Sequence, residues 1–373
     1  MNQNLQAEDK DLKTLLVTGG AGFLGRAILQ ELVKGKVQGL QALQEVRVFD
    51  TKPVDEDPFA AQGSSTRLVS ILGDVCSLDQ LRDAVRGVDA VIHGASLIDW
   101  GNASAKLLEE VNIVGTENLI RACQEGGVEI LVYTSTMDVV CSGKPITDAD
   151  ETLPYPATFA DEYARTKACA EQVAIAANGS KCVSAEGAPE KFLRVCSVRP
   201  CGMFGEADPY HMGNVLSALK SGQLSFRLGK GDAVFQHVYV GNVAHAHLLA
   251  LSKLVARDTE VAGQIYLATD MPAVNFFDAL EPIIVELGYE FPPKTRYLPF
   301  GVALVLGTLL EGIAFLLRPL ISLDLPLTRS SVKILCQDMS IKTDKAQREL
   351  GYRPIYSEAE AIARTVAYYK TRD

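Results

Sequence analysis

The first half of the chain alternates short apolar runs with longer stretches whose apolar residues recur at helical spacing. Apolar runs typical of buried strands lie at 14–20, 45–50, 65–75, 89–96 and 129–136. Helices are predicted at 25–35 and at 105–127, the second of which ends at a glycine pair. This alternation predicts an α/β fold with a doubly wound parallel sheet and helices on both faces. Ligands of such sheets bind beyond the carboxyl ends of the strands.

A glycine-rich segment joins the first predicted strand to the first predicted helix. In LLVTGGAGFLGRAI, Gly19, Gly22 and Gly25 have the spacing of a dinucleotide-binding loop. The three glycines would permit a tight turn, a close approach to a pyrophosphate, and close packing of the helix on the strand. The N–H groups that open the helix, on Phe23 and Leu24, would face the negative charge. The loop and the sheet together predict a Rossmann-type fold that binds a nicotinamide dinucleotide.

Two aspartates end the next two predicted strands. A carboxylate at Asp50 can accept a hydrogen bond from the adenosine ribose and would repel a 2′-phosphate, which favours NAD over NADP. Lys52 would soften that preference, and a turn-starting aspartate is the alternative interpretation of Asp50. Asp74 either faces the adenine or caps the helix that begins near Ser77.

Two parts of the chain interrupt the alternation. Residues 178–191 are small, polar and rich in turn formers, which predicts a surface loop. We expect residues 12–200 to form the NAD-binding domain, with 235–268 returning to it. Residues 201–234 and 269–370 are expected to form a smaller substrate-binding lobe.

One stretch of that lobe is apolar enough to suggest a membrane. FGVALVLGTLLEGIAFLL, at 300–317, is close to the roughly 20 residues that cross a bilayer. However, Glu311 interrupts it, and Arg318 and Pro319 close it. The stretch predicts either a buried or substrate-covering helix, or a helix that gives the protein peripheral contact with a membrane. A full span is the least favoured alternative.

Composition excludes several classes of protein. The chain has 373 residues, 47% of them hydrophobic, which is enough for a large core. A net charge of -10 and the lack of a long basic run argue against a nucleic-acid partner. Eight cysteines without CxxC spacing favour a reducing compartment, and five dispersed histidines predict no metal site. The polar sequence MNQNLQAEDKDLK lacks the apolar core of a secretory signal, so we expect a protein on the cytoplasmic side.

A tyrosine and a lysine lie one helical turn apart in DEYARTK. Tyr163 and Lys167 would share one helix face, although most such pairs are ordinary surface residues. Free tyrosine has a pKa of about 10, which is too high for a base near neutrality. A neighbouring ammonium and a positive nicotinamide ring would both stabilise the phenolate. Lys167 could supply this charge and also hold the nicotinamide ribose.

Several ordered motifs resemble one family of dehydrogenases. TGGAGFLG followed by YARTK is similar to the extended short-chain dehydrogenase/reductase superfamily. With six further segments, the chain from about residue 12 to 370 resembles the 3β-hydroxysteroid dehydrogenase family. The six segments are VIHGASLIDWG, VNIVGTENLIRAC, LVYTSTMDVV, SVRPCGMFGEADP, HVYVGNVAHAHLLAL and TDKAQRELGYRP.

The resemblance implies roles for individual residues. Tyr163 is implied as the general base and Lys167 as its electrostatic partner. The family usually has serine where this chain has Thr136, which can donate the same hydrogen bond to the substrate oxygen; Ser135 is the alternative. Asn112 resembles an asparagine that supports the proton relay, but it could instead bond a neighbouring strand's backbone. The resemblance also implies NAD as cofactor, a steroid or sterol substrate, and a homodimer.

Two reactions remain open for a 3β-hydroxyl substrate. One group of the family oxidises the hydroxyl and then shifts the Δ5 double bond to Δ4; the other oxidises a 4α-carboxysterol, and the β-keto acid loses CO2. LIDWG and LLRPLI resemble the first group, but ATDMP has only Asp270 where that group has two adjacent carboxylates. RPCGMFGEADP and LGKGDAVFQHVYVGNV resemble the second group more closely, so we favour the second reaction. A catalytically inactive dinucleotide-binding regulatory protein is the alternative from another class.

Overall fold

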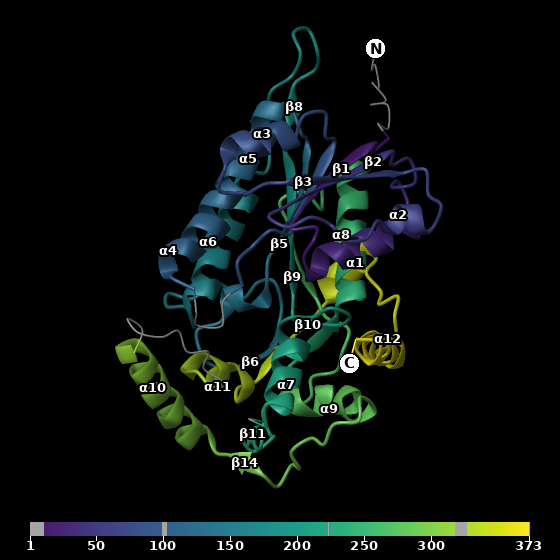
Figure 1. Ribbon diagram of the computed structural model, residues 1–373. Helices are drawn as coiled ribbons and strands as arrows, with labels where there is room; N and C mark the ends of the chain where they lie inside the picture. Colours follow the sequence, from purple (N-terminus) through teal and green to yellow (C-terminus); the bar gives the residue numbers. More distant parts are fainter. Residues whose placement is uncertain (1–10, 99–102, 223, 318–326, 373) are drawn as a thin grey trace.

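The computed structural model describes residues 11–98, 103–222, 224–317 and 327–372 (Figure 1). Residues 1–10, on which the expectation of no secretory signal partly rests, lie outside the described residues. Parts of the LIDWG and LLRPLI motifs, with Arg318 and Pro319, also lie outside them.

A seven-stranded parallel sheet forms the centre of the molecule, in the order β13-β9-β5-β4-β1-β2-β3. Its strands are β1 (Thr14–Thr18), β2 (Glu45–Asp50), β3 (Arg67–Leu72), β4 (Ala90–His93), β5 (Ile130–Thr134), β9 (Arg194–Pro200) and β13 (Ile265–Ala268). The predicted doubly wound parallel sheet is confirmed. The strand order reverses at β1, which lies between β2 and β4. Ligands of open α/β sheets bind at such a switch point.

Helices cover both faces of this sheet (Figure 1). One face carries α1 (Phe23–Val33) and α8 (Val240–Val255), with α2 (Pro58–Ala61) beside α1. The other face carries α3 (Leu78–Ala84), α5 (Gly115–Gly126) and α6 (Glu162–Ala176).

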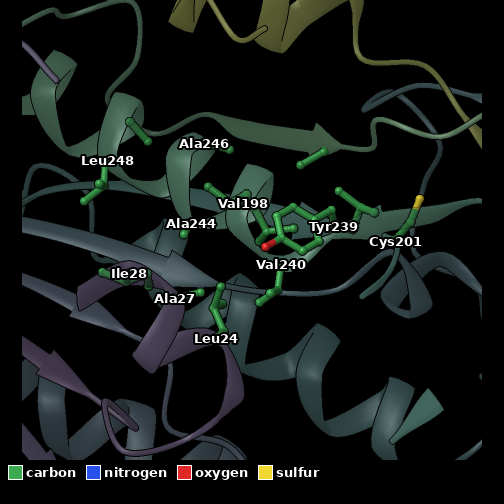
Figure 2. Packing of buried hydrophobic residues seen from close by; sticks show 14 of the residues in the cluster. Leu24, Ala27, Ile28, Val198, Cys201, Tyr239, Val240, Ala244, Ala246 and Leu248 are labelled. Atoms are coloured by element: carbon green, nitrogen blue, oxygen red, sulfur yellow. The ribbon is translucent and has the colours of Figure 1, made fainter. Parts of the chain in front are cut away.

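The packing of α1 on α8 shows how the apolar spacing in the sequence becomes a core. Leu24, Ala27 and Ile28 of α1 are buried beside Val240 and Ala244 of α8 (Figure 2). Burial of an aliphatic side chain of valine or leucine size stabilises the fold by about 1.5–3 kcal/mol. This packing fixes the start of α1, and with it the glycine-rich loop, against the carboxyl ends of the strands.

The predicted helix at 105–127 contains a change of helix type. It runs as α4 (Ala105–Leu108), the π-helix η1 (Glu109–Val114) and α5, and it stops at Gly127, whose φ of +71° is left-handed. The glycine pair therefore ends the helix as the sequence predicts, because glycine adopts a positive φ without steric cost. Single π-helical turns inside α-helices are frequent at functional sites.

The remaining elements lie mainly beyond the carboxyl ends of the sheet strands (Figure 1). Three two-stranded parallel ladders pair β6 (Ile146–Ala149) with β15 (Met339–Ile341), β10 (Gly202–Phe204) with β12 (His237–Tyr239), and β11 (Arg227–Leu228) with β14 (Tyr297–Leu298). The helices are α7 (His211–Lys220), α9 (Phe276–Glu286), α10 (Phe300–Leu317), α11 (Arg329–Leu335) and α12 (Glu358–Lys370), with the short helices η2 (Met137–Val140) and η3 (Ala346–Leu350).

The segment at 178–191 is more ordered than the expected surface loop. β7 (Lys181–Cys182) and β8 (Lys191–Phe192) pair in an antiparallel hairpin, and Cys182 is buried. The turn-forming residues occupy the connection between the two strands. Composition alone missed the short strands because two residues are too few to show alternation.

The apolar stretch at 300–317 forms the single helix α10, which packs against α11. Ala303 is buried, whereas Val305 is 59% exposed and Leu309 is 58% exposed. Glu311 pairs with Arg329 at the start of α11. The interpretation of 300–317 as a buried helix is therefore wrong for the face of α10 that carries Val305 and Leu309. No helix within the described ranges has both the length and the apolar character to cross a membrane.

Candidate active site

The glycine-rich loop is closely packed against the sheet. Gly19 has a φ of +70°, and a Cβ atom there would lie 2.7 Å from the backbone nitrogen of Ala95. A Cβ atom on Gly25 would lie 2.3 Å from the backbone oxygen of Gly19. Gly22 precedes α1, whose first N–H groups, on Phe23 and Leu24, have no intrahelical acceptor because of their position in the first turn. The loop thus fits a pyrophosphate, which needs a close backbone and free N–H donors.

Asp50 lies at the edge of this loop. Its Oδ2 accepts a hydrogen bond from the backbone N–H of Ala21 at 3.0 Å, and its Oδ1 accepts one from the N–H of Lys52 at 3.1 Å. The carboxylate is partly exposed, so it keeps acceptor capacity for a ribose hydroxyl. Asp50 lies 25 residues after Gly25 in the sequence, and the structure brings it to the glycine-rich loop.

Asp74 lies after β3 and does not cap α3. Its Oδ1 accepts the backbone N–H of Cys76 at 2.9 Å, which stabilises the turn before the helix. Ser77 occupies the N-cap position of α3. The interpretation of Asp74 as the helix cap therefore placed the cap three residues too early in the chain, whereas a place for Asp74 near the adenine stays a prediction.

Tyr163 and Lys167 share one face of α6, which begins after Asp161. The Lys167 ammonium is buried, donates to the backbone oxygen of Thr134 at 2.7 Å, and lies 4.5 Å from the centre of the Tyr133 ring. Burial lowers the pKa of Lys167 to about 7. The structure thus places the ammonium on the carboxyl end of β5.

The phenol of Tyr163 has a strongly shifted pKa. Burial raises the pKa of Tyr163 well above its ordinary value, and the carboxylate of Asp138 raises it further. A hydrogen bond with Thr136 acts in the opposite direction. Burial and the nearby carboxylate, rather than the ammonium of Lys167, therefore dominate the pKa of this phenol.

Thr136 lies beside Tyr163 at the point where β5 leads into η2. Its Oγ1 donates to the Asp138 Oδ2 at 2.9 Å and accepts from the Asp138 backbone N–H at 3.2 Å. Ser135, the alternative in the sequence, is buried, and its hydroxyl has no hydrogen-bond partner among the described residues. Of these two hydroxyls, Thr136 is the one that acts on the pKa of Tyr163, and it lowers that pKa.

Asn112 makes structural contacts from the π-helix η1. Its Oδ1 accepts the backbone N–H of Leu97 at 2.8 Å, and its Nδ2 donates to the Leu97 oxygen and to Thr166 Oγ1, both at 3.1 Å. It therefore ties the segment after β4 to α6. Asn112 thus bonds the backbone of a neighbouring segment, which agrees with its alternative interpretation as a structural amide. A role of Asn112 in proton transfer stays a prediction.

The sequence interpretation missed three groups near this site. Asp138 and Tyr210 both act electrostatically on Tyr163. His93, at the end of β4, bonds Thr18 Oγ1 at 2.7 Å and Thr116 Oγ1 at 3.0 Å, and burial lowers its pKa to about 3. The neutral His93 ring therefore connects β1 to α5 at the switch point. Only Asp138 had a sequence signal, which is its place two residues after Thr136.

The parallel sheet has a glycine-rich loop at its switch point and a tyrosine, a lysine and a threonine at the carboxyl ends of its strands. This combination defines a dinucleotide-binding protein of the short-chain dehydrogenase/reductase class. Residues 16–299 match the sequence model of the 3-beta hydroxysteroid dehydrogenase/isomerase family. The chain belongs to this family.

Similar proteins with known names agree with this membership. Human 3 beta-hydroxysteroid dehydrogenase type 7 is 34% identical over 360 residues, covering 95% of this chain and 94% of the relative. Mouse sterol-4-alpha-carboxylate 3-dehydrogenase, decarboxylating, is 31% identical over 354 residues, covering 95% and 90%. A crystal structure of a dTDP-glucose 4,6-dehydratase mutant from Streptomyces venezuelae, with NAD bound, matches with a TM-score of 0.68 at 25% identity, covering 95% and 96%.

Proposed function

We propose that this protein is an NAD-dependent dehydrogenase that oxidises the 3β-hydroxyl of a steroid or sterol to the 3-ketone. The observation that carries the proposal is the convergence of Tyr163, Thr136 and Lys167 at the carboxyl ends of the strands, next to the glycine-rich loop. The substrate class is supported by the names of the two relatives, both of which are 3-dehydrogenases of steroids or sterols.

In this proposal the cofactor lies across the switch point. The first N–H groups of α1, including those of Phe23 and Leu24, hold the pyrophosphate, and Asp50 accepts a hydrogen bond from the adenosine ribose. Lys167 would hold the nicotinamide ribose. NAD, when bound, accepts the hydride from the alcohol carbon.

Tyr163 and Thr136 act on the substrate oxygen. Tyr163 takes the hydroxyl proton, and Thr136 orients the oxygen. The phenol of Tyr163, a half-buried residue, resists forming a full phenolate, because its pKa is raised well above the ordinary value. Proton removal therefore needs either a positive charge at the bound cofactor or a simultaneous loss of the phenol's own proton.

We also propose a division of labour along the chain. Residues 12–200 with 235–268 hold the dinucleotide, and residues 201–234 with 269–370 hold the steroid. This division is supported by β13, which pairs with β9 in the large sheet, and by the location of α7, α9, α10 and α11 beyond the strand ends (Figure 1).

For the chemistry after oxidation, the sterol-carboxylate reaction is favoured over the Δ5-Δ4 isomerisation. An isomerase needs a carboxylate that is free to move a proton on the substrate. Asp270 is instead held by the Tyr239 backbone N–H at 3.1 Å and by the Asn242 side chain. A β-keto acid loses CO2 without such a shuttle, so the bound state of Asp270 supports the decarboxylating outcome.

The test of the proposed function is NADH formation from 3β-hydroxysteroids with and without a 4α-carboxyl group. The Tyr163→Phe variant keeps the ring but loses the proton acceptor, so its rate should fall by about 10²–10⁴-fold while NAD binding persists. Tyr368→Phe on α12 is the matched control and should keep the wild-type rate. A wild-type protein that forms no NADH from any of these alcohols would refute the function. A fully active Tyr163→Phe variant would refute the role of Tyr163.

We further propose that α10 gives the protein peripheral contact with a membrane on its cytoplasmic side. Its exposed side chains Val302, Val305, Leu309 and Ile313 form an apolar stripe at helical spacing. Apolar helix faces of this kind bury into the lipid interface, where a sterol would also reside. We also propose that the protein is a homodimer, as the family resemblance implies. Sedimentation equilibrium would measure its oligomeric state.

A further inference from the structure

The ammonium of Lys167 lies inside the protein with little to balance its charge. The residue is 3% exposed, and within the described part of the chain its side chain makes one hydrogen bond, to the backbone oxygen of Thr134 at 2.7 Å. Burial disfavours the charged form and lowers the pKa of Lys167 to about 7. A neighbour that stabilises the charged form therefore decides how much of the ammonium is present near neutral pH.

The carboxylate of Glu171, one helical turn after Lys167 on α6, is a weak counter-ion for this charge. It raises the pKa of Lys167, but by less than burial lowers it. Its oxygens already accept hydrogen bonds from Arg199, Ser197 and Tyr155. The guanidinium of Arg199 contacts the carboxylate at 2.6 Å and compensates its charge. Another group is therefore needed to hold the ammonium in its charged form.

The aromatic ring of Tyr133, on β5, faces the ammonium. The Lys167 Nζ atom lies 4.5 Å from the ring centre. A cation at this distance is attracted by the negative face of the ring, and the attraction is largest where water is excluded. Tyr133 is 1% exposed, so water does not weaken this contact. Burial raises the pKa of Tyr133 well above its ordinary value, so the ring itself is neutral.

The imidazole of His93 packs against the Tyr133 ring. The two ring centres are 5.7 Å apart, and the planes are inclined by 54°. Hydrogen bonds to Thr18 and Thr116 fix the imidazole in turn. Burial lowers the pKa of His93 to about 3, so the imidazole is neutral and adds no positive charge beside Lys167. The titratable groups on the elements packed around Lys167 are His93 from β4, Tyr133 from β5, Tyr163 and Glu171 from α6, and Arg199 from β9.

We propose that Tyr133 is a positioning residue whose ring face keeps Lys167 charged and in place at the carboxyl end of β5. The importance of Tyr133 for the reaction rate rests on the proposed function, whereas its effect on the charge of Lys167 does not. The ring attracts the charge as a whole, so N–H groups of Lys167 remain for the nicotinamide ribose. Tyr133 takes part in no bond that forms or breaks during oxidation, because it acts only through Lys167.

The inference predicts the direction in which the pKa of Lys167 moves when the ring is lost. The ring stabilises the ammonium relative to the neutral amine. An aliphatic side chain at position 133 removes this stabilisation, so the pKa of Lys167 should fall below about 7. The ammonium is present below its pKa, so a rate that needs it should decline as pH rises through that pKa. The decline should therefore begin at a lower pH in the variant.

The direct test is an NMR titration of Lys167 in ligand-free protein that is isotope-labelled at the lysine Cε and Nζ atoms. The signal of Lys167 is identified by its loss in Lys167→Met. In Tyr133→Leu the pKa of Lys167 should be lower by about 1 than in wild type, as expected for loss of a desolvated cation–π contact. Tyr133→Phe, the conservative variant, keeps the ring face and should retain a pKa close to the wild-type value.

The matched control is Tyr266→Leu on β13. Tyr266 is also 1% exposed, and Lys345 lies 5.0 Å from the centre of its ring. Its replacement removes the same volume from the same sheet and should leave the pKa of Lys167 unchanged. If Tyr133→Leu does not fold, 3,4,5-trifluorophenylalanine at position 133 replaces it, because this side chain keeps the shape of the ring but weakens its negative face. It should then lower the pKa of Lys167 relative to Tyr133→Phe.

NADH formation from a 3β-hydroxysteroid gives the second readout. With a wild-type pKa of about 7 and a decrease of about 1, the ammonium fraction falls by about tenfold at pH 8 and by about twofold at pH 6. The kcat of Tyr133→Leu relative to wild type should follow this profile. A variant with only a damaged core would lose rate to the same extent at both pH values.

The outcomes separate this inference from the proposed function. Equal pKa values of Lys167 in Tyr133→Leu and Tyr133→Phe refute the inference, whatever substrate the enzyme oxidises. A lowered pKa with no NADH formed by the wild-type protein refutes the proposed function but leaves the effect of the ring on Lys167 standing. A lowered pKa without the pH-dependent loss of kcat refutes the importance of Tyr133 for the rate.

Discussion

At the scale of single residues, we expect Asp50 to determine which dinucleotide the site accepts. Its carboxylate is fixed at the edge of the glycine-rich loop by the N–H groups of Ala21 and Lys52. Asp50→Ala removes one acceptor for the ribose and the repulsion of a 2′-phosphate. The preference for NAD over NADP should therefore fall by about tenfold, because a hydrogen bond contributes about 1 kcal/mol or more. Dissociation constants for NAD and NADP, measured by calorimetry, give this ratio.

The control for this measurement is Asp83→Ala on α3, whose carboxylate pairs with Arg86 at the surface. It should leave the ratio unchanged. A ratio that is the same in wild type and Asp50→Ala would place the adenosine ribose away from Asp50. Wild-type preference for NADP would contradict the cofactor assignment itself.

At the scale of an element, α10 shows that apolar length does not decide whether a helix is buried. It packs against α11 and buries Ala303, whereas Val305 and Leu309 stay exposed. The double variant Val305→Glu/Leu309→Glu should reduce sedimentation with phosphatidylcholine vesicles by tenfold or more, because each apolar side chain contributes about 1.5–3 kcal/mol to burial in lipid. NADH formation from a water-soluble steroid should persist.

The matched control is Val285→Glu on α9, because Val285 is also exposed, at 56%, but lies on another helix. It should sediment like wild type. Wild-type protein that stays in the supernatant, or a double variant that still sediments fully, would exclude α10 as the membrane contact.

At the scale of the whole molecule, Asn242 connects α8 to the parts of the chain that follow it. Its Oδ1 accepts from the backbone N–H groups of Ile355 and Tyr356, and its Nδ2 donates to the Tyr356 oxygen and to Asp270. Asn242 itself is buried, and Asn242→Leu leaves its part-buried partners without these hydrogen bonds, so the free energy of unfolding should fall by about 3 kcal/mol or more. Urea unfolding followed by circular dichroism measures the change.

Asn214→Leu, at an exposed position of α7, is the control and should change the free energy of unfolding by less than about 0.5 kcal/mol. If Asn242→Leu unfolds at the same urea concentration as wild type, the four hydrogen bonds do not couple the C-terminal segment to α8. A second, earlier transition in the variant would show that the two parts unfold separately.

The sequence determined the features that depend on neighbours along the chain. Apolar spacing identified β1 to β5 and the helix at 105–127, because the periods of strands and helices follow from backbone geometry. Glycine spacing located the phosphate loop, since only glycine fits where Gly19 has a positive φ and Gly25 approaches a backbone oxygen. The four-residue interval between Tyr163 and Lys167 placed both on one helix face.

Tertiary structure alone decided what those side chains face. Lys167 bonds the oxygen of Thr134 on β5, and the pKa of Tyr163 is influenced most strongly by burial and by Asp138. These groups come together because α6 packs on η2 and β9. The exposure of α10 depends on which elements cover it. Contacts of this kind join residues distant in sequence, and their energies depend on burial and orientation, which no local pattern specifies.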